Sequence, residues 1–99
     1  MAQYDVFRPT GSSVLVVDCQ SRALEHLPTR FTVALLPLGN SPIPAAILNP
    51  ILTLDAEEYQ FAPQFAATLS LTELGERVGS IASEHYRLLD AIDLLVGSV

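Results

Sequence analysis

The sequence has few of the residues on which catalytic and metal sites depend. Its 99 residues include two histidines, one cysteine, no lysine and no tryptophan. A single cysteine excludes an internal disulfide framework, and neither Cys-x-x-Cys nor His-Glu-x-x-His spacing is present to hold a metal. Five arginines stand against a formal net charge of -6, so we expect no direct nucleic-acid binding. These scarcities predict a protein without a catalytic site, a metal or a cofactor.

Long hydrophobic runs are also missing. No apolar run reaches the roughly 20 residues that a membrane helix needs, and the N-terminus lacks the basic-then-apolar pattern of a signal peptide. We therefore expect a cytoplasmic protein with no membrane association. Nevertheless, 49% of the residues are hydrophobic and only 16% are charged. For a single small domain, residues 1–99, this composition predicts apolar surface that a partner covers.

The few residues able to do chemistry are expected to have structural roles. Cys19 ends a buried apolar strand, where a small inert hydrophobe is the common outcome. His85 falls on the apolar side of a predicted helix, which favours a packing or interface residue. The acidic turn Asp55–Glu58 lacks the ligand count of a calcium loop. Asp18 and Gln20 follow the same strand as Cys19, and buried polar groups must be hydrogen-bonded, so we predict that they tie the next loop to the sheet.

Most of the chain has the pattern of short strands between turn-rich segments. Alternating or β-branched runs predict strands over Gln3–Phe7, Ser13–Asp18, Phe31–Leu36, Ile51–Leu54, Tyr59–Phe61 and Phe65–Leu71. The segment Cys19–Pro28 is an irregular connection, and Pro37–Pro50, with four of the seven prolines, is a long surface loop. Asp55–Glu58 is the turn of a hairpin. Ser70–Glu73 matches a capping box, but Gly75 and Gly79 allow only a short turn after it.

One long amphipathic helix is predicted, from Ser80 as N-cap to a stop at Gly97. Its apolar residues recur at spacings of three and four, at Val78, Ile81, Ala82, Leu88, Leu89, Ile92, Leu95, Val96 and Val99. Short strands followed by one helix predict a mainly β fold, a small antiparallel barrel or curled sheet that the helix caps. This apolar stripe exceeds what one small sheet needs, so a homodimer is expected, with the helix end and neighbouring strands in its interface.

From end to end the chain resembles the CcdB family, toxins of plasmid-borne toxin–antitoxin pairs that poison bacterial DNA gyrase. The matching segments are Gln3–Phe7, the Val-Asp-x-Gln-Ser motif at Val17–Ser21, Pro50 with Ile51–Leu54, Glu76 with Val78, and Ala91–Leu95. The resemblance implies an SH3-like barrel with a C-terminal helix, a homodimer, and an antitoxin (CcdA-like) whose flexible tail wraps the toxin. It also implies a protein that is not an enzyme, maintains plasmids, and takes part with its antitoxin in transcription autoregulation.

Partner contacts follow from the same resemblance. The residues expected to bind the A subunit of gyrase, or another topoisomerase, are Ala23, Leu24, Asp93, Val96, Gly97, Ser98 and Val99. Arg8, Arg22 and Arg30 are expected to receive carboxylates of the antitoxin, next to the loops Arg8–Ser13 and Pro37–Ala46.

The chain departs from the family at its tail. Family toxins end Trp-Gly-Ile, and the matching positions here are Gly97, Ser98 and Val99; Asp93 replaces an Asn and Val96 a Phe. The loop from Arg30 to Gly39 is about two residues longer than in the family. Weakened or altered targeting is therefore expected. The alternative is a non-toxic interaction module that binds an antitoxin without inhibiting gyrase.

Overall fold

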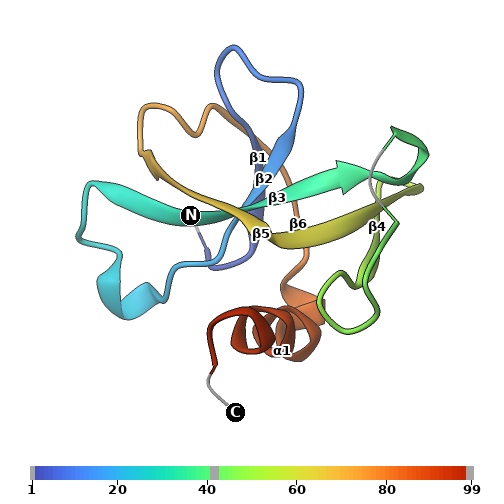
Figure 1. The fold of residues 1–99 in the computed structure, drawn as a ribbon. Helices are drawn as coiled ribbons and strands as arrows, with labels where there is room; N and C mark the ends of the chain where they lie inside the picture. The colour runs from blue at the N-terminus through green and yellow to red at the C-terminus, as the bar shows by residue number, and fades with distance from the viewer. Residues whose placement is uncertain (1, 41–42, 98–99) are drawn as a thin grey trace.

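The computed structural model describes residues 2–40 and 43–97. Six antiparallel strands form one sheet in the order β4-β5-β3-β2-β1-β6, and a single α-helix follows them (Figure 1). The strands are β1 (Asp5–Arg8), β2 (Leu15–Asp18), β3 (Thr29–Pro37), β4 (Ile51–Leu54), β5 (Glu57–Ser70) and β6 (Glu76–Ser80). The 3₁₀ turns are η1 (Arg22–Leu24), η2 (Leu38–Asn40) and η3 (Ala82–Glu84), and the helix is α1 (His85–Val96). The predicted mainly β fold with one C-terminal helix is confirmed.

The sheet curls into a nearly closed barrel whose inner face is the core. Val6, Val17, Val33, Leu35 and Phe61 are fully buried there. The α1 helix adds Leu88 and Ala91 to the same cluster, so it lies against the core as expected.

The two edge strands approach one another at a glycine. A Cβ placed on Gly79 of β6 would lie 2.8 Å from the Cδ1 atom of Leu54 on β4. The missing side chain at Gly79 therefore leaves room for Leu54, and this contact brings the ends of the sheet together.

The strands predicted over Tyr59–Phe61 and Phe65–Leu71 are one strand, β5. Its register against β3 jumps: Val33 faces Ala66, whereas Ala34 faces Ala62. The residues between Ala62 and Ala66 therefore form a bulge, and Pro63, which has no N–H to donate, is accommodated within it. The expectation of two strands was wrong because proline in a sequence marks a break in pairing and does not show that the strand resumes.

The predicted start of the helix was also wrong. Glu76–Ser80 is an edge strand paired with β1, and α1 begins only at His85, after η3. Ser80 Oγ accepts a hydrogen bond from the N–H of Ala82 at 3.2 Å, so this serine caps the 3₁₀ turn and not the α-helix. The ladder with β1 supplies backbone bonds that outweigh the poor strand propensity of Gly79. The predicted stop at Gly97 is confirmed, and its N–H bonds to Asp93 O at 2.6 Å.

Two predicted turns are present. Ser70 and Glu73 form a reciprocal capping box: Ser70 N–H donates to Glu73 Oε1 at 2.8 Å and Glu73 N–H to Ser70 Oγ at 3.3 Å. The hairpin between β4 and β5 is confirmed, but its turn is shorter than the predicted Asp55–Glu58, because Glu57 and Glu58 already pair with β4. The turn consists of Asp55 and Ala56, both with positive φ, 50° and 66°. Positive φ at both central residues is the type I′ turn that matches the twist of paired strands.

Candidate protein-interaction surface

The side chains that could do chemistry are dispersed or buried. Within residues 2–40 and 43–97, no group of three or more His, Cys, Asp and Glu side chains is placed to hold a metal ion. Cys19 is buried, and its burial, with the nearby Asp18 carboxylate, raises the pKa of the thiol far above its usual value. The thiol therefore stays protonated, and a protonated buried thiol is a poor nucleophile. None of the helices in the described part of the chain is long and apolar enough to cross a bilayer.

The outer side of α1 is apolar and uncovered. Its exposed hydrophobic side chains are Tyr86, Leu89, Leu94, Leu95 and Val96. Val96 is 70% exposed and Leu94 57%, whereas Leu88 and Ala91 on the inner side are fully buried. Several large apolar side chains exposed on one short helix are typical of a site where another molecule binds.

A buried polar network fixes the η1 turn. Asp18 is fully buried, accepts a bond from Gln20 N–H at 3.1 Å, and pairs with Arg22 at 3.2 Å and with Arg30 at 3.4 Å. Gln20 Nε2 donates to Leu24 O at 2.9 Å, while Gln20 Oε1 accepts from Phe31 N–H at 2.9 Å. The prediction that Asp18 and Gln20 tie the following loop to the sheet is confirmed.

The same network explains the motif Val17–Ser21. Ser21 Oγ accepts a hydrogen bond from Ala23 N–H at 3.2 Å and so caps η1. Ala23 and Leu24 themselves are exposed, and Leu24 keeps 46% of its accessible surface. The motif therefore holds two apolar side chains outward on a rigid support.

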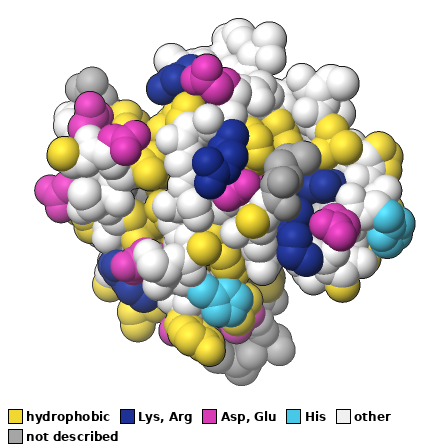
Figure 2. All heavy atoms as spheres, turned by 180° about the vertical axis from the view of Figure 1, so that it is seen from behind, with side chains coloured by type: hydrophobic (Ala, Val, Ile, Leu, Met, Phe, Trp, Pro, Cys, Tyr) yellow, Lys and Arg dark blue, Asp and Glu magenta, His cyan; other side chains and the backbone are white. Residues whose placement is uncertain are grey.

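The arginines expected to bind an antitoxin differ in their exposure to solvent. Arg30 is 3% exposed, and its guanidinium donates to the carbonyl oxygens of Glu25, Leu27 and Thr29. Arg8 is exposed and lies 3.7 Å from Glu76, and the side chain of Arg22 is 30% exposed. Figure 2 shows the arginine side chains spread over the back of the molecule, with acidic side chains beside them. The antitoxin contact of all three arginines stays a prediction, with Arg30 the least accessible.

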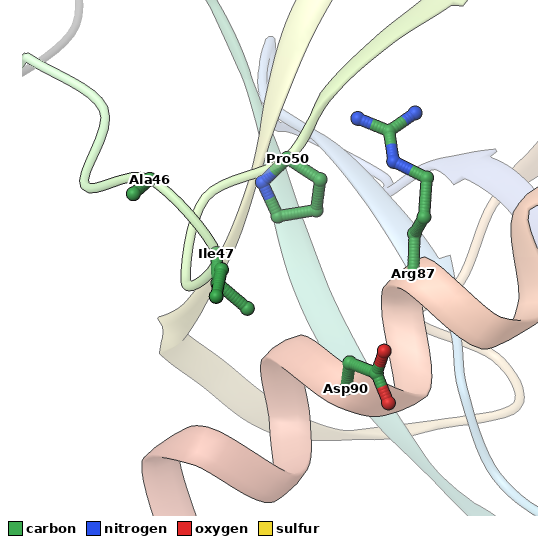
Figure 3. A pocket seen from close by; sticks show the side chains of 5 residues that line it. All are labelled: Ala46, Ile47, Pro50, Arg87 and Asp90. Atoms are coloured by element: carbon green, nitrogen blue, oxygen red, sulfur yellow. The ribbon is translucent and has the colours of Figure 1, made fainter.

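A groove separates α1 from the loop before β4. Ala46, Ile47 and Pro50 face Arg87 and Asp90 of the helix across a space of about 390 Å³ (Figure 3).

Asn49 anchors this loop from behind. Its Nδ2 donates to Phe61 O at 3.0 Å and to Gln64 Oε1 at 2.9 Å, and its Oδ1 accepts from Ala45 N–H at 3.0 Å. Sequence reasoning missed Asn49. The sequence signal for this role is its position: asparagine, a residue type common in turns, stands directly before Pro50 and the strand β4.

The residues expected to bind a topoisomerase fall into two groups. Asp93, Val96 and Gly97 lie together at the end of α1, whereas Ala23 and Leu24 lie on η1. Ser98 and Val99 lie outside the described residues. Each group is exposed, and their joint role in one contact stays a prediction.

A comparison with protein families supports the resemblance seen in the sequence. The model of the CcdB protein family matches residues 3–97, nearly the whole chain. No curated protein matches the chain.

Proposed function

The chain belongs to the CcdB family, and from this we propose that it is the toxin of a type II toxin–antitoxin pair whose target is DNA gyrase or a related topoisomerase. The observation that carries the proposal is the group of exposed apolar side chains on α1, whose C-cap Gly97 occupies a target-binding position of the family. A toxin that works by binding needs such a surface and needs no catalytic group. The target contact comprises the end of α1 and the η1 turn.

The target contact of this chain is weaker than that of other family members. Gly97 occupies the position of a tryptophan in the family pattern. A buried Trp covers about 150–250 Å², and truncating an interface Trp commonly costs at least ~2 kcal/mol. Because ~1.4 kcal/mol is tenfold in affinity, the loss amounts to roughly 30-fold or more.

The functional unit is a homodimer. Leu89 and Leu95 of α1 pack against a second copy, which leaves Val96 at the end of the helix exposed for the target. Obligate interfaces of this kind bury roughly 2,000 Å² or more in total. Sedimentation at micromolar concentration is expected to give the dimer mass.

The antitoxin binds through a disordered segment that becomes ordered on the toxin. Its carboxylates reach Arg8 and Arg22 first, because Arg30 is enclosed by its own carbonyl partners. The loops Arg8–Ser13 and Pro37–Ala46 supply further contacts. Ordering the segment costs roughly 2–5 kcal/mol, so tight binding requires a large buried area and a strongly negative heat-capacity change.

Expression of the chain in bacteria with wild-type gyrase and with CcdB-resistant gyrase tests the target. Growth arrest only with wild-type gyrase is expected, at higher expression than a toxin ending Trp-Gly-Ile requires. The triple variant Gly97→Trp, Ser98→Gly, Val99→Ile should bind the A subunit more tightly in a pull-down and give more cleaved DNA. Strong gyrase-dependent cleavage by the unmodified chain would contradict the weakened tail, and arrest in both strains would exclude gyrase.

A second candidate is a non-toxic module that binds the antitoxin alone. Gly97 at the anchor position favours it, since the fold and the arginines persist without the anchor. In that case, expression leaves growth unchanged in both strains, while the chain still binds the antitoxin segment.

A further inference from the structure

The groove between α1 and the loop before β4 has the size of a small-molecule site. Ala46, Ile47 and Pro50 form its loop side, and Arg87 and Asp90 form its helix side (Figure 3). Its volume of about 390 Å³ is in the lower part of the range for pockets that bind small molecules. None of the residues proposed to contact a topoisomerase lines it, and only Ala46 belongs to a loop proposed for the antitoxin.

Hydrogen bonds hold both walls of the groove in place. Asn49 of the loop is 2% exposed, and its side-chain amide donates to Phe61 O at 3.0 Å and to Gln64 Oε1 at 2.9 Å. On the opposite wall, Arg87 donates to Ile51 O at 3.1 Å, which joins the helix to the first residue of β4. Since the walls are fixed in advance, a ligand that enters the groove orders little of the chain, and binding avoids that entropic cost.

The loop wall is apolar. Ile47 is 67% exposed, Ala46 is also exposed, and Pro50 beside them is buried. An aliphatic chain lying in the groove covers part of the Ile47 side chain, and the apolar area removed from water stabilises the complex.

The helix wall carries a negative charge that the chain leaves unbalanced. The Arg87 guanidinium lies 2.8 Å from the Glu84 carboxylate, which compensates its charge. Figure 3 shows this guanidinium extending away from the Asp90 carboxylate. Among the described residues, the Asp90 carboxylate has no ion pair. Asp90 therefore presents a carboxylate to the groove without a counterion of its own.

The arginines of this chain are all committed to other carboxylates. The sequence has five basic side chains, all arginine, and each forms an ion pair at 3.7 Å or less: Arg8–Glu76, Arg22–Asp18, Arg30–Asp18, Arg77–Asp5 and Arg87–Glu84. A counterion for Asp90 therefore comes from another molecule. The formal net charge of -6 attracts cations to the protein in general.

An apolar wall opposite an unpaired carboxylate is complementary to a cation on an aliphatic chain. An aliphatic primary amine is protonated at pH 7, as the lysine side chain is. We propose that the groove binds a small aliphatic ammonium ligand, with its charged group on Asp90 and its chain along Ile47 and Pro50. The same carboxylate repels an anion, and a neutral chain gains the apolar contact alone. The inference goes beyond the proposed function, because neither toxicity nor antitoxin binding enters into it.

Pentylamine is the probe, and pentanol is the uncharged control of equal chain length. Titration followed by the amide NMR shifts of the protein should give saturable changes at Ala46, Ile47 and Asp90. Pentanol should bind about fivefold more weakly, because an ion pair that is open to water contributes up to about that factor. Equal affinities for the two probes, or pentylamine shifts that do not saturate, would overturn the inference.

Two variants with the same change of charge test the role of Asp90. Asp90→Asn and Glu58→Gln each remove one negative charge at an exposed position. Asp90→Asn should weaken pentylamine binding about fivefold and leave pentanol binding unchanged, whereas Glu58→Gln should alter neither. Equal losses in the two variants would mean that the net charge of the protein attracts the amine, and the groove site would be excluded.

The apolar wall is tested with a second pair of variants. Ile47→Ala should weaken binding of both probes several-fold, whereas Ile43→Ala is the control, since Ile43 is 93% exposed and does not line the groove. If both variants bind the probes as the parent does, the ligand lies elsewhere and the inference is wrong. A failure of the proposed function is separate, because unchanged growth on expression of the chain has no bearing on these titrations.

Discussion

Two exposed regions of this protein are supported in opposite ways. The η1 turn is only three residues long, yet Asp18, Gln20 and Ser21 fix it from below with a buried hydrogen-bond network. The α1 helix is the longest helical element, yet of its side chains only Leu88 and Ala91 are buried. Polar groups hold the short element in place, whereas the long element leaves most of its apolar side free. The rigid support and the larger group of exposed apolar side chains therefore lie in different parts of the molecule.

The largest expected effect comes from removing the carboxylate below η1. Asp18→Ala leaves the buried guanidinium of Arg30 without its ion pair. Breaking one side of a buried pair typically costs about 3–5 kcal/mol of unfolding free energy. Urea denaturation of Asp18→Ala and of the exposed control Asp90→Ala measures the difference, and the control should change by less than about 0.5 kcal/mol. Equal effects would mean that the network does not support η1.

Leucine-to-alanine substitutions on the two sides of α1 should affect different properties, stability on the inner side and partner binding on the outer side. Leu88→Ala opens a cavity in the core and should cost about 2–5 kcal/mol of stability. Leu94→Ala, on the exposed side, should cost less than about 0.5 kcal/mol but weaken partner binding. Thermal unfolding and a gyrase or antitoxin pull-down, run on both variants, distinguish these effects. Unchanged binding in Leu94→Ala would place the partner away from this surface.

Lowering the pH should reveal a smaller contribution to stability, made by Asp5 of β1. Burial alone raises the pKa of Asp5, but the hydrogen bond from Arg77, at 3.1 Å, and the Ala2 amide outweigh it, so the pKa is lowered on balance. A carboxyl with a lower pKa in the folded state stabilises the protein above its unfolded pKa, about 4. That stability is lost as pH falls through the folded value.

Asp5→Asn tests this linkage. The variant should be less stable than the parent at pH 7, and the gap between their urea midpoints should close as pH drops below about 4. A gap that stays constant with pH would mean that the loss comes from altered packing and not from the charge of Asp5.

The sequence predicted what short-range patterns determine. The strands, the capping box at Ser70, the tie through Asp18 and the end of the helix at Gly97 each depend on residues close together in the chain. It failed where long-range pairing decides the outcome. Pro63 interrupts the sequence pattern of β5 but not its ladder with β3, and Glu76–Ser80 is a strand only because β1 lies beside it. The role of Asn49 depends on the same long-range geometry.

The smallest expected effect provides a control for the whole comparison. Ala56 has φ 66° in the hairpin turn, a conformation that suits glycine better than alanine. Ala56→Gly should therefore raise the free energy of unfolding by about 0.5–1 kcal/mol, because relief of strain outweighs the extra freedom of the unfolded chain. Ala45→Gly, in the exposed loop before Asn49, is the matched substitution without positive φ and should not stabilise. Since this hairpin belongs to neither η1 nor α1, Ala56→Gly should leave partner affinity unchanged. If affinity rises with stability, binding depends on the rigidity of the whole fold, and the division between a rigid support and a free binding surface does not hold.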